Sequence, residues 1–199
     1  MAVSIKPLSA KIGAESTGAD FSKTVPSADL INIKQGLLRH LVMVIRNQSL
    51  NPEKLLAAVR LFGETMEQHL TDTLMQNHPE IAVLDSSKMP PDKQNRVIPF
   101  GARTWHTDHT NHECPPKYTA LYAVNLPSSG GDTSFANMHF AFASLPQGEQ
   151  ASLQKLQTVN KIEDFGYISA EAQIKFGSLP IHPLIRTNTE TGKKAIYVH

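Results

Sequence analysis

The chain has 199 residues and a mass of 21.9 kDa, which is the size of one globular domain with a single core. Hydrophobic residues make up 40% of the chain and charged residues 19%, which excludes a highly charged disordered chain and a fibrous repeat. The formal charge of +1 offers no net field that would draw the chain to nucleic acid or to an anionic membrane.

Cysteine content and the N-terminal segment bear on the compartment. The single cysteine, Cys114, cannot form an internal disulfide, which fits a reducing environment. The first ten residues lack the layout of a signal peptide, and no apolar run approaches the roughly 18 residues that span a bilayer. We therefore expect a cytoplasmic protein without nucleic-acid or membrane partners.

The first quarter of the chain predicts a short strand followed by a helix. Residues 3–8 are predicted to be the strand, and residues 13–21 a turn-rich connection. Ser27 is expected to cap a helix whose apolar positions recur at helical spacing as far as Leu41.

A second strand and a second helix follow directly. The β-branched run at residues 41–45 predicts a buried strand in its second half. Asn51 followed by Pro52 predicts an N-cap and the first residue of a helix that continues to about Gly63.

The middle of the chain is predicted to hold strands and a long loop. Residues 81–84 and the alternating residues 118–126 favour strands. Three prolines and several charges indicate a surface loop over residues 86–101, and residues 127–133 are predicted to form a turn.

The last quarter predicts two short helices and a hairpin. The helices are expected at residues 138–145 and at residues 150–159, the second with Leu153 and Leu156 facing inward. Residues 181–187 and 194–198 are expected to pair as a hairpin.

The densest group of candidate metal ligands lies in WHTDHTNHEC, residues 105–114. In an extended chain alternate side chains share a face, so His106 and Asp108 would point the same way. Imidazole and carboxylate suit ferrous iron, and a second histidine from elsewhere would complete a three-ligand face with open positions. Taken alone, the pair is also compatible with a polar loop of solvated histidines.

A second motif, GGDT at residues 130–133, lies downstream. Its glycines predict a tight turn where backbone and hydroxyl groups can approach a small anion closely. An ordinary hairpin turn is the alternative, and it is the combination with the His-x-Asp pair that is informative.

These motifs resemble the core of the taurine dioxygenase and 2,4-dichlorophenoxyacetate dioxygenase family, over residues 105–146. Four further stretches look like the family's landmarks in the family's order: IGAESTGADFSK, LVMVIRNQSLNP, LFGE and HPLIRTNTETGKKAIYV. The resemblance implies an α+β protein whose core is a double-stranded β-helix (jelly-roll, cupin-like) with flanking helices. It implies one domain over residues 1–199, incomplete at its C-terminus and without its last strands.

Members of that family are Fe(II)- and 2-oxoglutarate-dependent dioxygenases. The resemblance therefore implies an enzyme that uses O2 to hydroxylate a small organic substrate, with an anionic one as an option, and releases succinate and CO2. By motif, His106 and Asp108 match the first two iron ligands. Thr133 matches the threonine that contacts the 2-oxoglutarate carboxylate. No catalytic residue beyond the metal ligands is implied, and the resemblance leaves the oligomeric state open, a homo-oligomer included.

Two parts of the family's site have no match in the sequence. These are the distal histidine ligand and the arginine that binds the far carboxylate of 2-oxoglutarate. We therefore expect either a fragment of a longer enzyme or an inactive relative. His182 matches a strand position of the family that is not a ligand, so we expect for it either a structural role or a role in supporting the metal ligands. His109 and His112 are expected in a partly solvated loop, and Cys114 as a small packed residue.

Substrate choice is less constrained. Gln68, with His69 beside it, stands where the taurine enzyme has an active-site histidine, and Ala102 stands where that enzyme has an asparagine. Both departures argue against taurine itself, although a one-residue shift of the loop would bring His69 into the site. Arg103 is a candidate for an anionic substrate, with a solvated loop arginine as the alternative.

Two other functions stay open. A truncated, metal-poor relative would serve as a non-catalytic binding module. The H-T-D-H run also looks like part of a zinc hydrolase motif, although zinc would need further nitrogen or sulfur ligands and GGDT would stay unexplained.

Overall fold

The computed structural model describes residues 3–68, 73–88, 104–161 and 170–198. The chain divides into two units. The first unit comprises Met1–Glu64, Thr133–Leu156 and Pro183–Tyr197, and the second comprises Thr65–Asp132, Gln157–His182 and Val198–His199. Both combine helices and strands, as expected for an α+β protein. No helix within the described ranges is long and apolar enough to cross a membrane.

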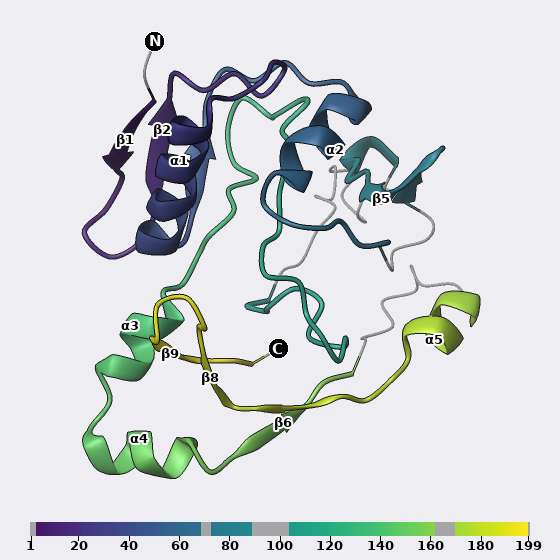
Figure 1. Cartoon of the computed structure of the whole chain (residues 1–199). Coiled ribbons are helices and arrows are strands. Elements are labelled where there is room, and N and C mark those ends of the chain that lie inside the picture. Colours follow the sequence, from purple (N-terminus) through teal and green to yellow (C-terminus); the bar gives the residue numbers. More distant parts are fainter. Residues whose placement is uncertain (1–2, 69–72, 89–103, 162–169, 199) are drawn as a thin grey trace. The chain divides into compact units, whose positions relative to one another are not determined.

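The first unit is built on a three-stranded sheet (Figure 1). Strand β1 (Ser4–Pro7) pairs antiparallel with β2 (Ala14–Thr17), which pairs parallel with β3 (Met43–Ile45). β1 and β3 lie where strands were predicted. β2 lies within the segment predicted as a turn-rich connection, so that prediction was wrong. The alternate residues Ala14 and Ser16 are fully buried, and their small side chains give no apolar signal in the sequence.

Helix α1 (Ser27–His40) packs against this sheet (Figure 1). Ile33 is fully buried. A Cβ added at Gly36 would lie 2.6 Å from Ile5 Cδ1 and 2.8 Å from Met43 Cε, so glycine is what lets the helix come this close. The predicted cap at Ser27 was wrong by one position: Pro26 is the N-cap, and no side chain caps the helix.

Helix α2 (Pro52–Arg60) follows its sequence signal more closely. The side chain of Asn51 accepts a hydrogen bond from Lys54 N at 2.9 Å, and Pro52 opens the helix as predicted. The helix ends at Arg60, a little before the expected end.

The core of the first unit gathers apolar side chains from several elements. Four buried residues form its centre: Val3, Phe21, Ile33 and Ala58. The ring of Phe62 packs beside that of Phe21 with 6.1 Å between centroids.

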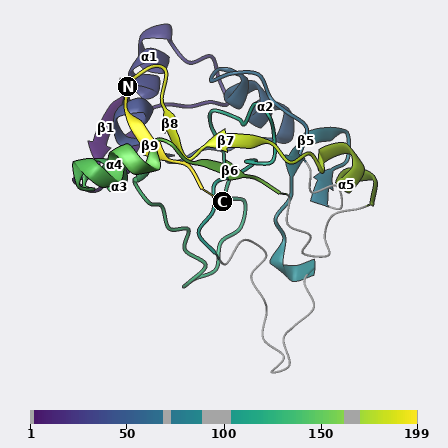
Figure 2. The same ribbon diagram turned by 90° about the horizontal axis from the view of Figure 1, so that it is seen from below.

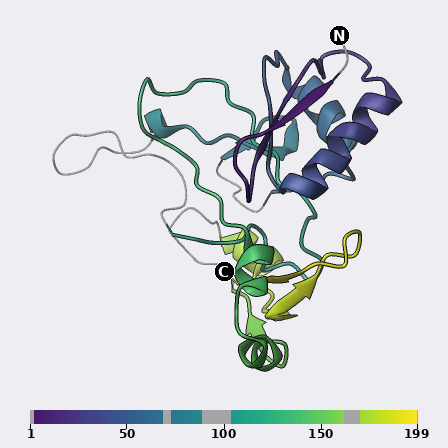
Figure 3. The ribbon, with the colours of Figure 1, turned by 90° about the vertical axis from the view of Figure 1, so that its left-hand side faces the viewer.

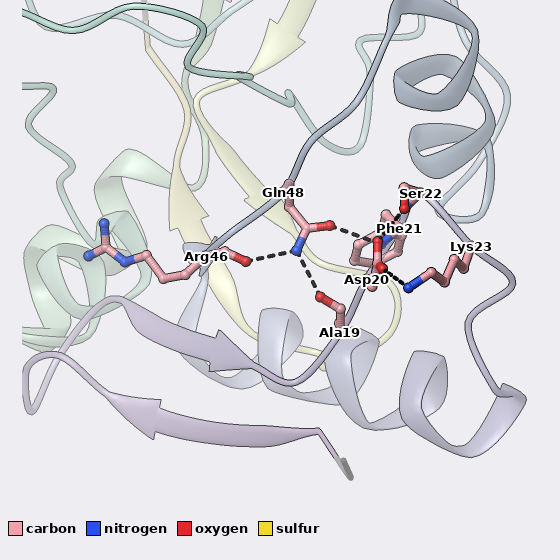
Figure 4. Close-up of polar contacts among 7 residues, drawn as sticks. All are labelled: Ala19, Asp20, Phe21, Ser22, Lys23, Arg46 and Gln48. Carbon is pink, nitrogen blue, oxygen red and sulfur yellow. Dashed lines mark hydrogen bonds and ion pairs between the residues drawn. The ribbon is translucent and has the colours of Figure 1, made fainter.

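One glutamine joins two connecting segments beside this core (Figure 4). Gln48 Oε1 accepts a hydrogen bond from Phe21 N at 2.9 Å, while its Nε2 donates to Ala19 O and Arg46 O, both at 2.8 Å. The side-chain amide therefore takes the place of a strand partner for backbone groups that have none.

The remaining elements of the first unit come from the second half of the chain. Helix α3 (Met138–Ala143) lies where it was predicted, capped by the Asn137 side chain. Helix α4 (Gln147–Leu153) begins and ends earlier than expected, and Leu156, predicted to face inward, is half exposed. The predicted hairpin is formed by β8 (Ile185–Thr187) and β9 (Lys194–Ile196), and α3 packs against β9 (Figure 3).

The described residues of the second unit form only short elements. Strands β4 (Leu74–Met75) and β5 (His78–Ala82) pair antiparallel, with β5 displaced toward the N-terminus from the predicted strand at residues 81–84. Strands β6 (Gln157–Val159) and β7 (Ile181–Pro183) also pair (Figure 2). The 3-10 helix η2 (Ser86–Lys88) and helix α5 (Ala170–Phe176) complete the unit. The predicted loop at 86–101 lies outside the described residues after Lys88.

Residues 118–126 do not form the predicted strand. Among the described residues no strand pairs with this segment, and its apolar side chains are largely exposed, Val124 by 87%. Alternation alone does not make a strand, because the backbone also needs a partner. The described strands form one three-stranded sheet and three two-stranded ones, so the strand pairing by itself does not establish the jelly-roll arrangement.

Candidate metal centre

The predicted ligand pair converges in the structure. His106 Nε2 lies 3.0 Å from Asp108 Oδ1, and both side chains are partly exposed. The expected convergence is thus confirmed, but the expected strand is not: Trp105 to Thr107 are irregular, and a turn begins at Asp108. A bend in the backbone brings the two side chains together instead of the pleat of a strand.

Both ring nitrogens of His106 face oxygen atoms. Nδ1 lies 3.0 Å from Thr104 O, a contact that a ring N–H satisfies by donating to the carbonyl. A neutral imidazole has one N–H, so Nε2 then faces the Asp108 carboxylate with a lone pair. That arrangement is favourable only with a second proton on the ring or with a cation between nitrogen and oxygen.

The donor set fits a divalent metal. Two ligands at about 2.1 Å from one metal ion, in adjacent positions, lie about 3 Å apart. The 3.0 Å between His106 Nε2 and Asp108 Oδ1 matches that spacing. One imidazole nitrogen and one carboxylate oxygen suit Fe(II). Within the described parts of the chain, no cluster of three or more His, Cys, Asp or Glu residues could hold a metal, so the pair stands as two ligands.

The turn after Asp108 carries two more histidines. His112 N donates to His109 O at 3.2 Å, and the two rings meet edge to face with 5.4 Å between centroids. Burial lowers the pKa of His109, the charge of His112 lowers it further and that of Asp108 opposes the shift; burial also lowers the pKa of His112. Burial therefore favours the neutral form of both rings, and both are half-buried, as a partly solvated loop requires. Cys114, expected to be packed, is exposed instead.

His182 ties this turn to strand β7. The ring is buried, with 6% of the residue exposed, and its Nε2 lies 3.0 Å from Thr110 O and 2.9 Å from His112 O. The structural role expected for His182 is thus seen in its contacts. The buried Thr110 and Asn111 were missed by sequence reasoning, because a polar run among three histidines and two acids looks solvated.

The GGDT turn has the backbone that its glycines predict. Gly130 and Gly131 have φ angles of 73° and 72°, a left-handed conformation that favours glycine at both positions. Thr133 is exposed and belongs to the first unit, whereas His106 and Asp108 belong to the second. Its role toward 2-oxoglutarate therefore stays a prediction.

Of the residues considered for substrate binding, the structure describes only Gln68. Gln68 N donates to Pro79 O at 3.1 Å, a backbone contact that carries no information on substrate. His69, Ala102 and Arg103 lie outside the described residues.

Comparison with known proteins decides the family. The sequence model described as "Taurine catabolism dioxygenase TauD, TfdA family" matches residues 4–199. The chain belongs to this family. Its structure is similar to the crystal structure of a taurine dioxygenase from Burkholderia xenovorans, with a TM-score of 0.73 and 28% identity, over 99% of this chain and 63% of that one. The TauD/TfdA assignment thus confirms the resemblance seen in the motifs, and the jelly-roll fold is that of the family.

Curated relatives of this TauD/TfdA-family chain include enzymes that are named for different compounds. Pentalenolactone F synthase of Streptomyces avermitilis is 30% identical over 94% of this chain and 68% of the relative. The alpha-ketoglutarate-dependent sulfate ester dioxygenase of Pseudomonas putida is 30% identical over 98% of this chain and 62% of the relative. The chain therefore spans about two thirds of the length of these relatives.

Proposed function

We propose that the protein is an Fe(II)- and 2-oxoglutarate-dependent dioxygenase in which His106 and Asp108 hold the metal. The observation that carries the proposal is the 3.0 Å approach of the imidazole nitrogen to the carboxylate oxygen. It occurs in a chain that the family matches over residues 4–199. The names of the curated relatives support this reaction type.

When bound, Fe(II) would supply the reaction of O2 with 2-oxoglutarate, which yields succinate and CO2 and places one oxygen atom on the substrate. This chain's own residues prepare that site. Thr104 O holds the His106 ring so that Nε2 is available to the metal, and the Asp108 carboxylate offsets part of the metal's charge.

Three further contributions are proposed on the family resemblance. The Thr133 hydroxyl would donate a hydrogen bond to the 2-oxoglutarate carboxylate. A second histidine would complete the metal face, and an arginine would bind the far carboxylate, both from residues that these 199 do not include.

The substrate class that we propose is a small organic anion. The relative from Pseudomonas putida is named for sulfate esters, and one from Cupriavidus pinatubonensis for 2,4-dichlorophenoxyacetate, both of which carry an anionic group. The lactone product named for the Streptomyces relative shows that this family also serves other chemistry, so the proposal stops at the class.

Succinate formation tests the proposal. The chain of 199 residues and a version extended at its C-terminus to the length of its relatives would be incubated with Fe(II), O2, 2-oxoglutarate and candidate anions. We expect succinate and CO2 from the extended version, and their loss in its Asp108→Ala variant. Glu113→Ala, an exposed acid in the same segment, is the matched control.

The non-catalytic module is the second candidate, since two ligands are all that the described residues bring together. It predicts metal or 2-oxoglutarate binding without succinate in either version. Turnover by the 199-residue chain alone would show that an internal residue completes the site.

A further inference from the structure

Three consecutive carbonyls of the turn after Asp108 accept hydrogen bonds from two side chains of a segment distant in the sequence. His182 Nε2 lies 3.0 Å from Thr110 O and 2.9 Å from His112 O. Between them, Asn111 O accepts from Ser178 Oγ at 3.1 Å. All of these residues belong to the second unit. The C-terminal part of the turn is thus bonded to Ser178 and His182.

The contact between His182 and Thr110 O is buried, whereas those to Asn111 O and His112 O are partly buried. Thr110, Asn111 and His182 are exposed by 2%, 5% and 6%. A buried carbonyl needs a donor, and none of the described strands supplies a backbone donor to these carbonyls. Because both partners of His182 Nε2 are acceptors, this nitrogen carries the ring hydrogen, and the tautomer of His182 is fixed.

The backbone conformation of the turn also has to be stabilised by contacts with residues outside it. His109, next to Asp108, has a φ of 54°, a left-handed conformation that is uncommon outside glycine. Such a conformation persists where the surrounding structure fixes it. The hydrogen bond from His112 N to His109 O closes the turn, and the bonds from His182 fix its far end.

We propose that His182 is a positioning residue for the metal ligands. By donating to the carbonyls of Thr110 and His112, it fixes the turn that leads directly out of Asp108, and so keeps the Asp108 carboxylate directed at His106. His182 acts through the backbone of the turn. The inference rests on the proposed role of His106 and Asp108 in holding the metal.

The test measures Mn(II) affinity of the full chain, by the electron paramagnetic resonance of the free ion. His182→Gln places an amide N–H close to the position of the ring Nε2, whereas His182→Asn is shorter and falls short of the carbonyls. We expect affinity to weaken about tenfold or more in His182→Asn, the range for losing a group that orients a ligand, and to stay near the wild-type value in His182→Gln.

A second variant separates positioning from general stability. Asn160 is buried, with 1% exposed, and its Nδ2 donates to Thr158 O at 3.0 Å and Pro180 O at 3.4 Å, so that it bonds the segment that holds His182 but neither acceptor belongs to the turn. Asn160→Ala is expected to lower the unfolding midpoint while leaving Mn(II) affinity within about threefold, because the hydrogen bonds that it removes do not orient a ligand.

Three outcomes would overturn the inference. Equal affinity in His182→Gln and His182→Asn would do so, and so would an equal loss in Asn160→Ala. The third is amide hydrogen exchange over residues 104–112 that is no faster in His182→Asn than in the wild type. Absence of Mn(II) binding both to the wild-type chain and to the extended version, or binding unchanged in Asp108→Asn, would overturn the metal-binding function itself. That result is distinct, since it appears without any change at His182.

Discussion

The sheet under α1 and the turn after Asp108 are held by different interactions. In the sheet, Ile33 is fully buried and Gly36 lets the helix approach Ile5 and Met43, so apolar packing fixes the arrangement. In the turn, the fixing contacts are side-chain hydrogen bonds to buried carbonyls. The comparison teaches that apolar periodicity reveals the first kind of structure, whereas a polar site can be just as buried without any such pattern.

The largest expected effect is the loss of stability on truncating a side chain in the core under α1. Ile33→Ala should lower the free energy of unfolding by about 2 to 5 kcal/mol, because it leaves a cavity in the core. Ile31→Ala, in the same helix at 55% exposure, should cost less than about 0.5 kcal/mol. Urea denaturation of the two variants measures the difference, and similar losses in both would contradict the packing described for α1.

The next largest effect is expected on metal binding at the turn, with the stability of the fold unchanged. Asp108→Asn should weaken Mn(II) binding by at least about tenfold, because it removes the anionic ligand and leaves a weak neutral one. The urea midpoint should stay within error of the wild type, since the Asp108 side chain is partly exposed. Glu113→Gln is the control, and a matching loss in that variant would mean that general negative charge attracts the ion.

These two regions also show how far the sequence alone leads. Asn51 and Pro52 predicted the start of α2 correctly, because a cap and a first-turn proline act locally. β2 was missed because its buried residues, Ala14 and Ser16, are too small to show a pattern. The His106–Asp108 pair was found from its spacing, but a bend in place of a strand brings it together. The contacts of His182 join residues about seventy positions apart, which local reasoning does not reach.

A smaller effect distinguishes a sequence signal for a helix cap that the structure confirms from one that it does not. Asn51 and Ser27 both look like helix caps in the sequence, but only the Asn51 side chain accepts a backbone hydrogen bond. Asn51→Ala should cost about 1 kcal/mol of unfolding free energy, and Ser27→Ala no more than a few tenths. Denaturation curves of the pair give both numbers, and a larger loss for Ser27→Ala would reverse the assignment.

The smallest effect concerns an exposed charge beside the core of the first unit (Figure 4). The hydrogen bond from Lys23, followed by those from Ser22, lowers the pKa of Asp20 from 3.8 to about 2. Because the folded value is the lower one, the stabilisation is complete above about pH 4 and is lost as the pH falls toward 2. A carboxyl titration by nuclear magnetic resonance should show this midpoint. Lys23→Ala should move it back toward 3.8, and an unmoved midpoint would assign the shift to Ser22 instead.

The division of the chain into units has a consequence for the order in which the protein can fold. The first unit is assembled from three separate stretches, the last of which ends at Tyr197. The amide of Asn137 donates to Lys11 O across 126 positions of sequence, and α3 packs on a strand that begins at Lys194. During synthesis the sheet β1–β3 can form early, but this unit closes only after its final hairpin has left the ribosome. Loop closures of this length slow folding, so completion of the first unit is expected to be slower than formation of its sheet.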